Sequence, residues 1–583
     1  MMKKTVAILY ITLFSIISGI IVAAQILGFA KLYYPVIVIF ASVFLSCLFG
    51  FLLTKLSYKF ILESLEGQNR LHLPKWAASV VTIAGILLLL IVLFLPLLLW
   101  PYSGINHELN WDAGFYHFPK AAEMVVTHSS WDLSIAYGEY PFGFESLIAA
   151  SLIISRAGYL IGAVHAVILL FLVLTLFLLV SRYSHIQSPY IFFAIVFIIA
   201  SYDIIRFTSL NPFQIFRVLA FTIGKNDFFL AAAMLAVIYF APIGPDHPKY
   251  NLFGLGLTSM LVCTTKPNGF LLIGYVWILT LVYQIKEWKT LGKIVKNQLL
   301  LWLGVILINL IGLLWALRNL LVQGKLFSEN SLSLQKLSII ANLSNPLFYR
   351  ALGLIPMMIL VLFLGTIIAS IFSKSKNWSI PSVFAILLIS FIITPAVLFF
   401  GSGQDASVIF WRLGFYLLAF EIPVIFLLLD RLFVWLFNPK SKKIGWVVNS
   451  GISLALTAIS LFACYQNYAR AIPNPANTIV LRDQYTHSVG VDGYYSAYDY
   501  VRKNVTNSVV WIENGLPFYL YGDQLTNSVT RSRPADYQVF LQTNWNGYSG
   551  FPSTLDTPEW NSQWTLVYAD PEGKVYKRKT ATQ

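Results

Sequence analysis

Long apolar runs separated by short polar stretches occupy most of the first 470 positions of the chain. An α-helix needs roughly 17–25 such residues to cross a lipid bilayer. We interpret the stretch 143–156 as a re-entrant or interfacial helix rather than as a span. The pattern predicts thirteen membrane-spanning helices, near residues 6–30, 35–54, 78–100, 157–181, 188–205, 226–242, 250–265, 268–285, 298–317, 351–372, 380–400, 411–436 and 444–466.

Basic residues in the loops orient these helices. Lys3 and Lys4 precede the first run, which places the N-terminus in the cytoplasm under the positive-inside rule. The segment 101–145 then falls outside, and it carries one basic residue against six acids. Because thirteen is odd, the C-terminal region also lies outside. The chain is therefore predicted to be a multi-pass protein of the inner (plasma) membrane, with the lipid bilayer as a partner.

Composition and charge narrow the class further. Hydrophobic residues make up 57% of the chain and charged residues only 11%. A soluble domain could not bury that much apolar surface. The net charge of +14 could suggest nucleic acid, but the basic residues sit in short loops between apolar runs, so no nucleic-acid partner is predicted. Cys47, Cys263 and Cys464 lie in or beside apolar runs, which argues against a disulfide framework or a thiolate zinc site.

The composition changes from about Ala471 onward. Residues 471–583 are rich in Asn, Asp, Tyr, Gly and Pro. VVWIENG (509–515) predicts a strand ending in a turn, and WTLVYADPEGKVYKR (564–578) predicts a hairpin. The expected fold class is a polytopic α-helical membrane protein, with a transmembrane module over 1–470 and a small extracytoplasmic α/β domain over 471–583.

Several cations lie on the outer face, where the positive-inside rule does not expect them. Snorkelling of a long side chain at a helix end would explain any one of them. It explains the group less well, because acids alternate with cations around this single face. Lys and Arg near the lipid boundary suit a phosphate or pyrophosphate headgroup. The cations are Arg206, Arg217, Lys225, Lys266, Arg318 and Arg412.

The first large outer loop holds the sequence NWDAGFYHFPKAAE at 110–123. Asp112 lies in it, with Glu108 four residues before and Tyr116 and His117 after. One interpretation is structural: Asp112 caps a turn, and His117 packs against the membrane surface. The functional interpretation is that Asp112 is a general base for a hydroxyl or amine that attacks the anomeric carbon of a sugar. The leaving phosphate would then need the outer cations.

A short helix is predicted after this acid. Pro119 suits a first helical turn, so the helix is expected over 119–127.

Six pieces of sequence run along most of the chain in a recognisable order: WDAGFYHFPKA (111–121), GKNDFFLAAAMLA (224–236), TKPNGFLL (265–272), RNLLVQGKLF (318–327), WRLGFYLL (411–418) and FYLYGDQL (518–525). In the order of its pieces and in the side of the membrane on which they are predicted to lie, the set resembles the GT-C membrane glycosyltransferases. This superfamily includes the protein O-mannosyltransferases and the lipid A aminoarabinose transferase.

The resemblance implies that the donor is a lipid-linked sugar, carried on a polyprenyl phosphate. It implies that the acceptor is a glycan, a lipid or a protein. It also implies inversion at the anomeric carbon and an acidic catalytic residue in the first outer loop. Asp112 matches that loop acid, and Asp227 matches an acid at a later helix start. The residues expected to contact the substrate or the donor phosphate are Tyr116, His117, Lys225, Asp227, Lys266, Arg318 and Arg412.

The chain departs from this family in two respects. Two additional helices, 6–30 and 35–54, precede the acidic loop, and Asp112 is followed by alanine rather than by a second acid. Either Asp112 or Glu108 can therefore be the catalytic base. No cofactor is predicted: a metal site could be assembled from Glu108, Asp112 and His117, but their spacing is not a recognised ligand pattern.

Three other classes are alternatives. A transporter or flippase would also use charges within the membrane, but it would favour repeated halves and helices broken near the midplane, and the sequence shows no paired halves. An O-antigen polymerase or ligase also acts on lipid-linked sugars, but the appended C-terminal domain fits that class less well. A nonenzymatic scaffold is compatible with the motifs.

Overall fold

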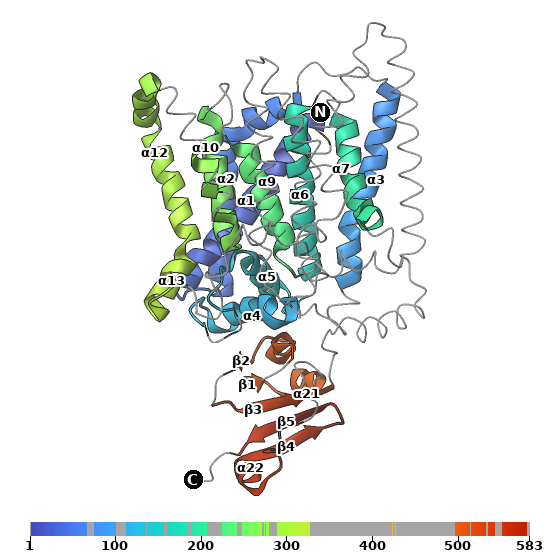
Figure 1. Cartoon of the computed structure of the whole chain (residues 1–583), viewed down its shortest axis with the longest axis vertical. Helices are drawn as coiled ribbons and strands as arrows, with labels where there is room; N and C mark the ends of the chain where they lie inside the picture. The colour runs from blue at the N-terminus through green and yellow to red at the C-terminus, as the bar shows by residue number, and fades with distance from the viewer. Residues whose placement is uncertain are drawn as a thin grey trace, which may run out of the picture.

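In the computed structural model the chain forms a bundle of helices with a small domain of mixed helix and sheet at one end (Figure 1). The structure describes residues 2–66, 75–100, 112–206, 224–241, 248–278, 288–326 and 496–579, with short gaps inside the third, fifth and seventh stretches, together with residues 423 and 426.

The described bundle helices follow the apolar runs of the sequence. α1 and α2 pack side by side, and a Cβ added at Gly19 would collide with Ser46, so the small residues allow the two backbones to approach closely. The described helices of the bundle include α1 (Met2–Phe29), α2 (Pro35–Glu66), α3 (Lys75–Trp100), α6 (Ile161–Tyr183), α7 (Ser188–Arg206), α9 (Asp227–Phe240), α10 (Pro248–Cys263), α12 (Trp288–Gly312) and α13 (Leu314–Gln323).

Among the described residues, three helices are long and apolar enough to cross a membrane: Lys3–Phe29, Pro35–Leu65 and Ile161–Tyr183. The 28 residues of α1 extend about 42 Å, more than the bilayer's hydrocarbon core. A fourth candidate is the pair Leu299–Gly312 and Leu314–Gln323, bent by 46° at its break. These helices support association with a membrane.

The number of spans stays a prediction. The runs at 351–372, 380–400, 411–436 and 444–466 lie outside the described residues, apart from residues 423 and 426.

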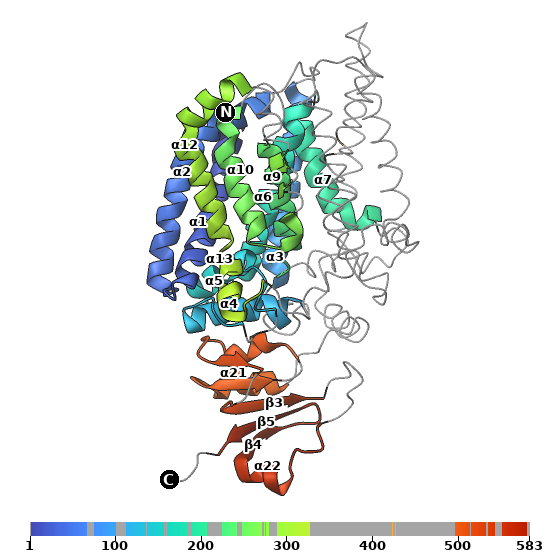
Figure 2. The same ribbon diagram turned by 60° about the vertical axis from the view of Figure 1, so that its left-hand side comes forward.

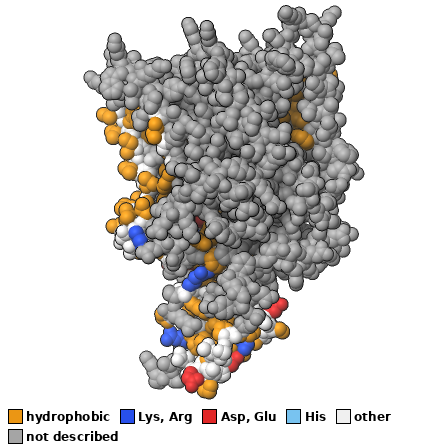
Figure 3. Space-filling model, in the orientation of Figure 1, with side chains coloured by type: hydrophobic (Ala, Val, Ile, Leu, Met, Phe, Trp, Pro, Cys, Tyr) orange, Lys and Arg blue, Asp and Glu red, His pale blue; other side chains and the backbone are white. Residues whose placement is uncertain are grey.

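Apolar side chains cover the outward side of α12 and α13. Leu300 is 85% exposed, and several neighbouring leucines and isoleucines on these helices are also exposed. Figure 3 shows apolar side chains gathered along this edge of the bundle. Such a surface would be unfavourable in water and suits contact with lipid.

The two ends of the bundle differ. The N-terminus of α1 lies at one end, and the C-terminal domain lies beyond the other end, as the two views agree (Figures 1 and 2). Three short helices lie at the end of the bundle nearest that domain: the π-helical turn η2 (Ala113–His117), α4 (Phe118–Thr127) and α5 (Gly143–Ile154), of which η2 and α4 contact it. The helix predicted over 119–127 is confirmed and begins one residue earlier. The stretch 143–156 is also helical, as α5.

The C-terminal domain is built on a five-stranded sheet with the strand order β2-β1-β3-β5-β4. β1 is parallel to β2 and β3, whereas β5 is antiparallel to β3 and β4. The strands are β1 (Val509–Ile512), β2 (Ser528–Thr530), β3 (Tyr537–Leu541), β4 (Trp564–Ala569) and β5 (Gly573–Arg578), accompanied by α21 (Ser496–Asn504), η6 (Pro517–Tyr521) and α22 (Pro558–Gln563).

Both strand predictions for this domain are confirmed. The strand predicted from residue 509 is β1, and the predicted hairpin is the β4–β5 pair. Its turn is closed by Asp570, whose carboxylate accepts hydrogen bonds from the backbone N–H groups of Glu572 and Gly573 at 2.8 and 2.6 Å. A short acid in this position is typical of a tight turn.

Candidate functional site

Charged side chains collect at the end of the bundle that faces the C-terminal domain. They come from η2, α4, the start of α5, the start of α9 and the turn η4 (Pro267–Gly269) that follows α10. These elements are far apart in the sequence, but each begins or ends at the same end of the bundle. The common position of the helix ends brings their polar residues together.

Asp112 forms an ion pair with Lys225. The Oδ2 atom of Asp112 lies 3.3 Å from Nζ of Lys225, and the two side chains are 17% and 9% exposed. Gly224, just before Lys225, lies close against η2 and α4: its φ of +85° favours glycine, and a Cβ there would collide with Ala113 and with the ring of Phe118. Asp112 makes no side-chain capping bond to η2, so the turn itself does not use its carboxylate.

A second ion pair joins Asp227 to Lys266, with 2.6 Å between Oδ1 and Nζ. Asp227 occupies the first turn of α9, where the helix dipole favours a negative charge. Between the two pairs, Asn226 donates from Nδ2 to the carbonyl of Thr265 at 3.5 Å. The Oδ1 atom of Asn226 is buried and has no hydrogen-bond partner among the described residues.

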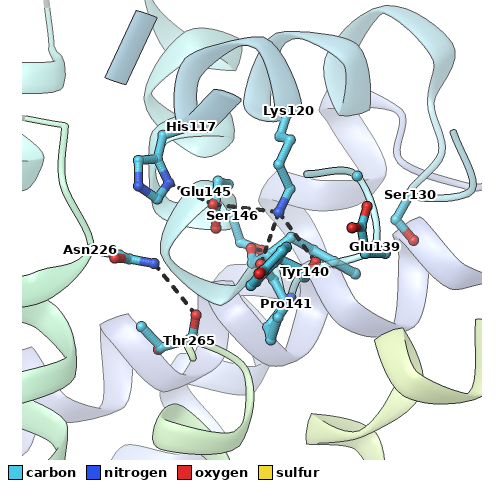
Figure 4. Close-up of polar contacts among 12 residues, drawn as sticks. His117, Lys120, Ser130, Glu139, Tyr140, Pro141, Glu145, Ser146, Asn226 and Thr265 are labelled. Atoms are coloured by element: carbon cyan, nitrogen blue, oxygen red, sulfur yellow. Dashed lines mark hydrogen bonds and ion pairs between the residues drawn. The ribbon is translucent and has the colours of Figure 1, made fainter. Parts of the chain in front are cut away.

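A third group is formed by His117, Glu145 and Lys120, all buried (Figure 4). Nδ1 of His117 lies 2.7 Å from Oε1 of Glu145, and Nζ of Lys120 lies 3.6 Å from the same oxygen. Lys120 also donates to the carbonyls of Tyr140 and Pro141 at 3.2 and 3.0 Å. The lysine therefore connects α4 to the chain that leads into α5.

Burial and pairing together set the protonation of this group. Desolvation lowers the pKa of His117, although the hydrogen bond with Glu145 acts in the opposite direction. Burial alone would raise the pKa of Glu145, but Lys120 and His117 outweigh it, so that pKa is lowered. Burial also lowers the pKa of Lys120, and the nearby Glu145 opposes this effect. A group made of an ionised Glu145, a charged Lys120 and a neutral His117 would have no net charge. A neutral sum keeps the cost of burying charge low.

Arg318 has a different environment. Its side chain is 2% exposed, and the guanidinium donates to the carbonyls of Ser130 and Gly138 at 2.6 and 2.7 Å. Nε and Nη2 also donate to Oδ1 of Asn319 at 3.1 and 2.9 Å. In this structure Arg318 therefore fastens α13 to the loop between α4 and α5. Its predicted contact with a donor phosphate stays a prediction.

The C-terminal domain covers this end of the bundle through polar and aromatic contacts. Tyr521 and Ser528 donate to the carboxyl of Glu123 at 2.8 and 3.1 Å. The guanidinium of Arg531 lies 4.3 Å from the ring centre of Phe115. Burial raises the pKa of Glu123 to about 7, against the effect of the two hydrogen bonds.

The structure brings together most of the residues predicted from the outer loops. Tyr116 lies beside His117, with 4.0 Å between the ring centres. Glu108 and Arg412 lie outside the described residues, so their roles stay predictions. The residues of this end that belong to the predicted set are Asp112, Tyr116, His117, Lys225, Asp227 and Lys266.

Three buried charged residues were missed in the sequence: Lys120, Glu123 and Glu145. The sequence contains a signal that could have identified Glu145. This acid lies in the apolar segment FGFESLIAA, where a buried carboxylate needs a partner. Among the described residues, no group of three or more His, Cys, Asp or Glu side chains could hold a metal ion.

No protein-family model, curated protein or solved structure matches this chain.

Proposed function

We propose that this protein is a membrane glycosyltransferase of the GT-C type, which moves a sugar from a polyprenyl-phosphate donor to a glycan, lipid or protein acceptor. The supporting observation is the pair of lysine–carboxylate contacts, Asp112 with Lys225 and Asp227 with Lys266, at one end of an apolar bundle. A donor of this kind has its lipid chain in the bilayer and its phosphate at the boundary, where this charged end would meet it.

The chemistry requires one base and a cationic environment for the leaving group. An oxygen of the acceptor attacks the anomeric carbon, and the bond from that carbon to the phosphate oxygen breaks. The acceptor's proton passes to Asp112, and the phosphate leaves toward Lys225 and Lys266. Attack from the face opposite the phosphate inverts the anomeric configuration.

The reaction is proposed to occur on the outer side of the membrane. Lys3 and Lys4 favour a cytoplasmic N-terminus, and the charged end of the bundle lies away from that terminus (Figure 1). The C-terminal domain would then be extracytoplasmic and would cover the site. It is a candidate surface for guiding the acceptor.

The proposal is tested with the purified full chain in lipid vesicles and a panel of polyprenyl-phosphate sugars. Native protein should transfer a sugar from at least one donor. Asp112→Asn keeps the size of the side chain but cannot take the proton, so the rate of transfer should fall about 10²- to 10⁴-fold.

Glu108→Gln is the matched control and should lower the rate of transfer by less than Asp112→Asn does. Normal turnover in Asp112→Asn together with an inactive Glu108→Gln would reassign the base to Glu108. Movement of the lipid-linked sugar across the vesicle membrane without transfer would instead identify a flippase.

A further inference from the structure

The buried group of His117, Glu145 and Lys120 fixes the orientation of an imidazole ring. Glu145 meets the ring at Nδ1, at 2.7 Å, and Lys120 holds the same carboxylate oxygen at 3.6 Å. Lys120 is itself anchored by two backbone carbonyls. The ring of His117 therefore has one nitrogen committed to the protein and cannot rotate without breaking a buried hydrogen bond.

This contact also selects the tautomer. An ionised carboxylate only accepts hydrogen bonds, so the proton of a neutral His117 must lie on Nδ1. Neutral imidazole carries a single N–H, which leaves a lone pair on Nε2. The directions of the pKa values agree: the pKa of Glu145 is lowered, and burial lowers the pKa of His117.

The second ring nitrogen lies at the charged end of the bundle. Figure 4 shows it on the side of the ring away from Glu145. Asp112 raises the pKa of His117 and Lys266 lowers it, in addition to the effect of Glu145. Asn226 nearby has a buried Oδ1 with no partner among the described residues. The Oδ1 atom of Asn226, and Nε2 of His117 in this tautomer, both suit a ligand that donates hydrogen bonds, as a sugar hydroxyl does.

We propose that His117 is a substrate-binding residue whose Nε2 accepts a hydrogen bond from a hydroxyl group of the bound sugars, and that Glu145, held by Lys120, is the residue that positions it. This inference rests on the proposed glycosyl transfer. The hydroxyl can belong to the donor sugar or to the acceptor, since the same atom on His117 would bind either.

The positioning step is tested without any substrate. Protein labelled with ¹⁵N-histidine is reconstituted in lipid at neutral pH, and His117→Asn identifies the His117 signals by their loss. The expected result is a neutral ring protonated on Nδ1, which becomes a mixture of tautomers in Glu145→Gln. An imidazolium, or a ring protonated on Nε2, in the native protein would overturn the proposal.

The binding step is tested by kinetics. Asparagine keeps an N–H near the position of Nδ1, so His117→Asn can preserve the contact with Glu145 while it removes Nε2 together with the rest of the ring and its contact with Tyr116. The Michaelis constant should rise about 2- to 10-fold, the effect of one lost neutral hydrogen bond. His128→Asn is the matched control, because His128 has a φ of +56° that asparagine tolerates.

The two Michaelis constants separate the sources of the hydroxyl. A rise confined to the donor assigns it to the donor sugar, and a rise confined to the acceptor assigns it to the acceptor. If folded His117→Asn leaves both constants unchanged, the binding role is wrong. If native protein transfers no sugar from any donor, the proposed function fails, and the tautomer measurement still decides whether Glu145 positions His117.

Discussion

Replacing Glu123 with glutamine tests how the C-terminal domain is held to the bundle. Glu123 is buried between α4 and that domain, and its carboxyl accepts hydrogen bonds from Tyr521 and Ser528. Burial raises its pKa from 4.5 to about 7; the two hydrogen bonds lower it, and Asp132 raises it further. A carboxyl that prefers to be protonated at a domain contact makes that contact depend on pH.

The size and sign of the effect follow from the pKa values. A shift from 4.5 to about 7 corresponds to roughly 3 kcal/mol between the protonated and ionised forms. The docked domain binds the proton more tightly, so docking is strongest below about pH 4.5, weakens as the pH rises to about 7 and is constant above that. Glutamine resembles the protonated acid, because its oxygen accepts from Tyr521 and its amide can donate to Asp132.

Glu123→Gln should therefore remove the pH dependence of docking and strengthen it by up to about 3 kcal/mol above about pH 7. Hydrogen exchange of the backbone amides in η6 and β2, corrected for intrinsic rates, reports docking at about pH 5 and pH 8. Glu559→Gln, at an exposed acid on α22, is the control. Equal protection of the native protein at both pH values, or the same pH response in Glu123→Gln, would refute the reasoning.

Three further predictions concern the ion pair, the buried arginine and the topology. Lys225→Gln should lower kcat/KM for the donor by roughly 10- to 100-fold, as expected for a lost charged hydrogen bond to phosphate, and steady-state kinetics measure it. Arg318→Gln should destabilise the fold by about 3 kcal/mol or more, because two charged hydrogen bonds to buried carbonyls are lost; an unchanged melting temperature with a raised donor KM would make Arg318 a phosphate ligand instead. Cysteines placed at Thr127 and Ser553 should both be labelled from outside the cell, and labelling of only one would contradict the predicted topology.

The sequence predicted the charged end of the bundle because membrane helices restrict where their ends can lie. Lys225, Asp227 and Lys266 are at the ends of apolar runs, so the alternation of the runs assigns them to one face. Asp112 and His117 follow from the same alternation. The structure agrees that these residues meet, and it adds which acid pairs with which lysine.

The contacts of Arg318 and Glu123 could not be predicted in this way. The guanidinium of Arg318 is satisfied by backbone carbonyls of the loop between α4 and α5, and nothing in the side-chain pattern encodes which carbonyls are near. Glu123 meets Tyr521, a residue about 400 positions later, across a domain contact. Hydrophobic patterns specify helices and strands, but they do not specify which residues far apart in the chain pack against each other.

The two lysine–carboxylate pairs differ in ways that bear on the choice of base. Asp227 is held at 2.6 Å by Lys266 and lies in the first turn of α9, where the helix dipole also stabilises its negative charge. Both effects make its carboxylate a poor proton acceptor. Asp112 has the longer contact, 3.3 Å to Lys225, is more exposed, and makes no capping bond to η2. A phosphate that drew Lys225 toward itself would weaken this ion pair and so raise the affinity of Asp112 for a proton. Asp112 therefore suits the proposed role of catalytic base, and Asp227 suits the role of a fixed support for Lys266.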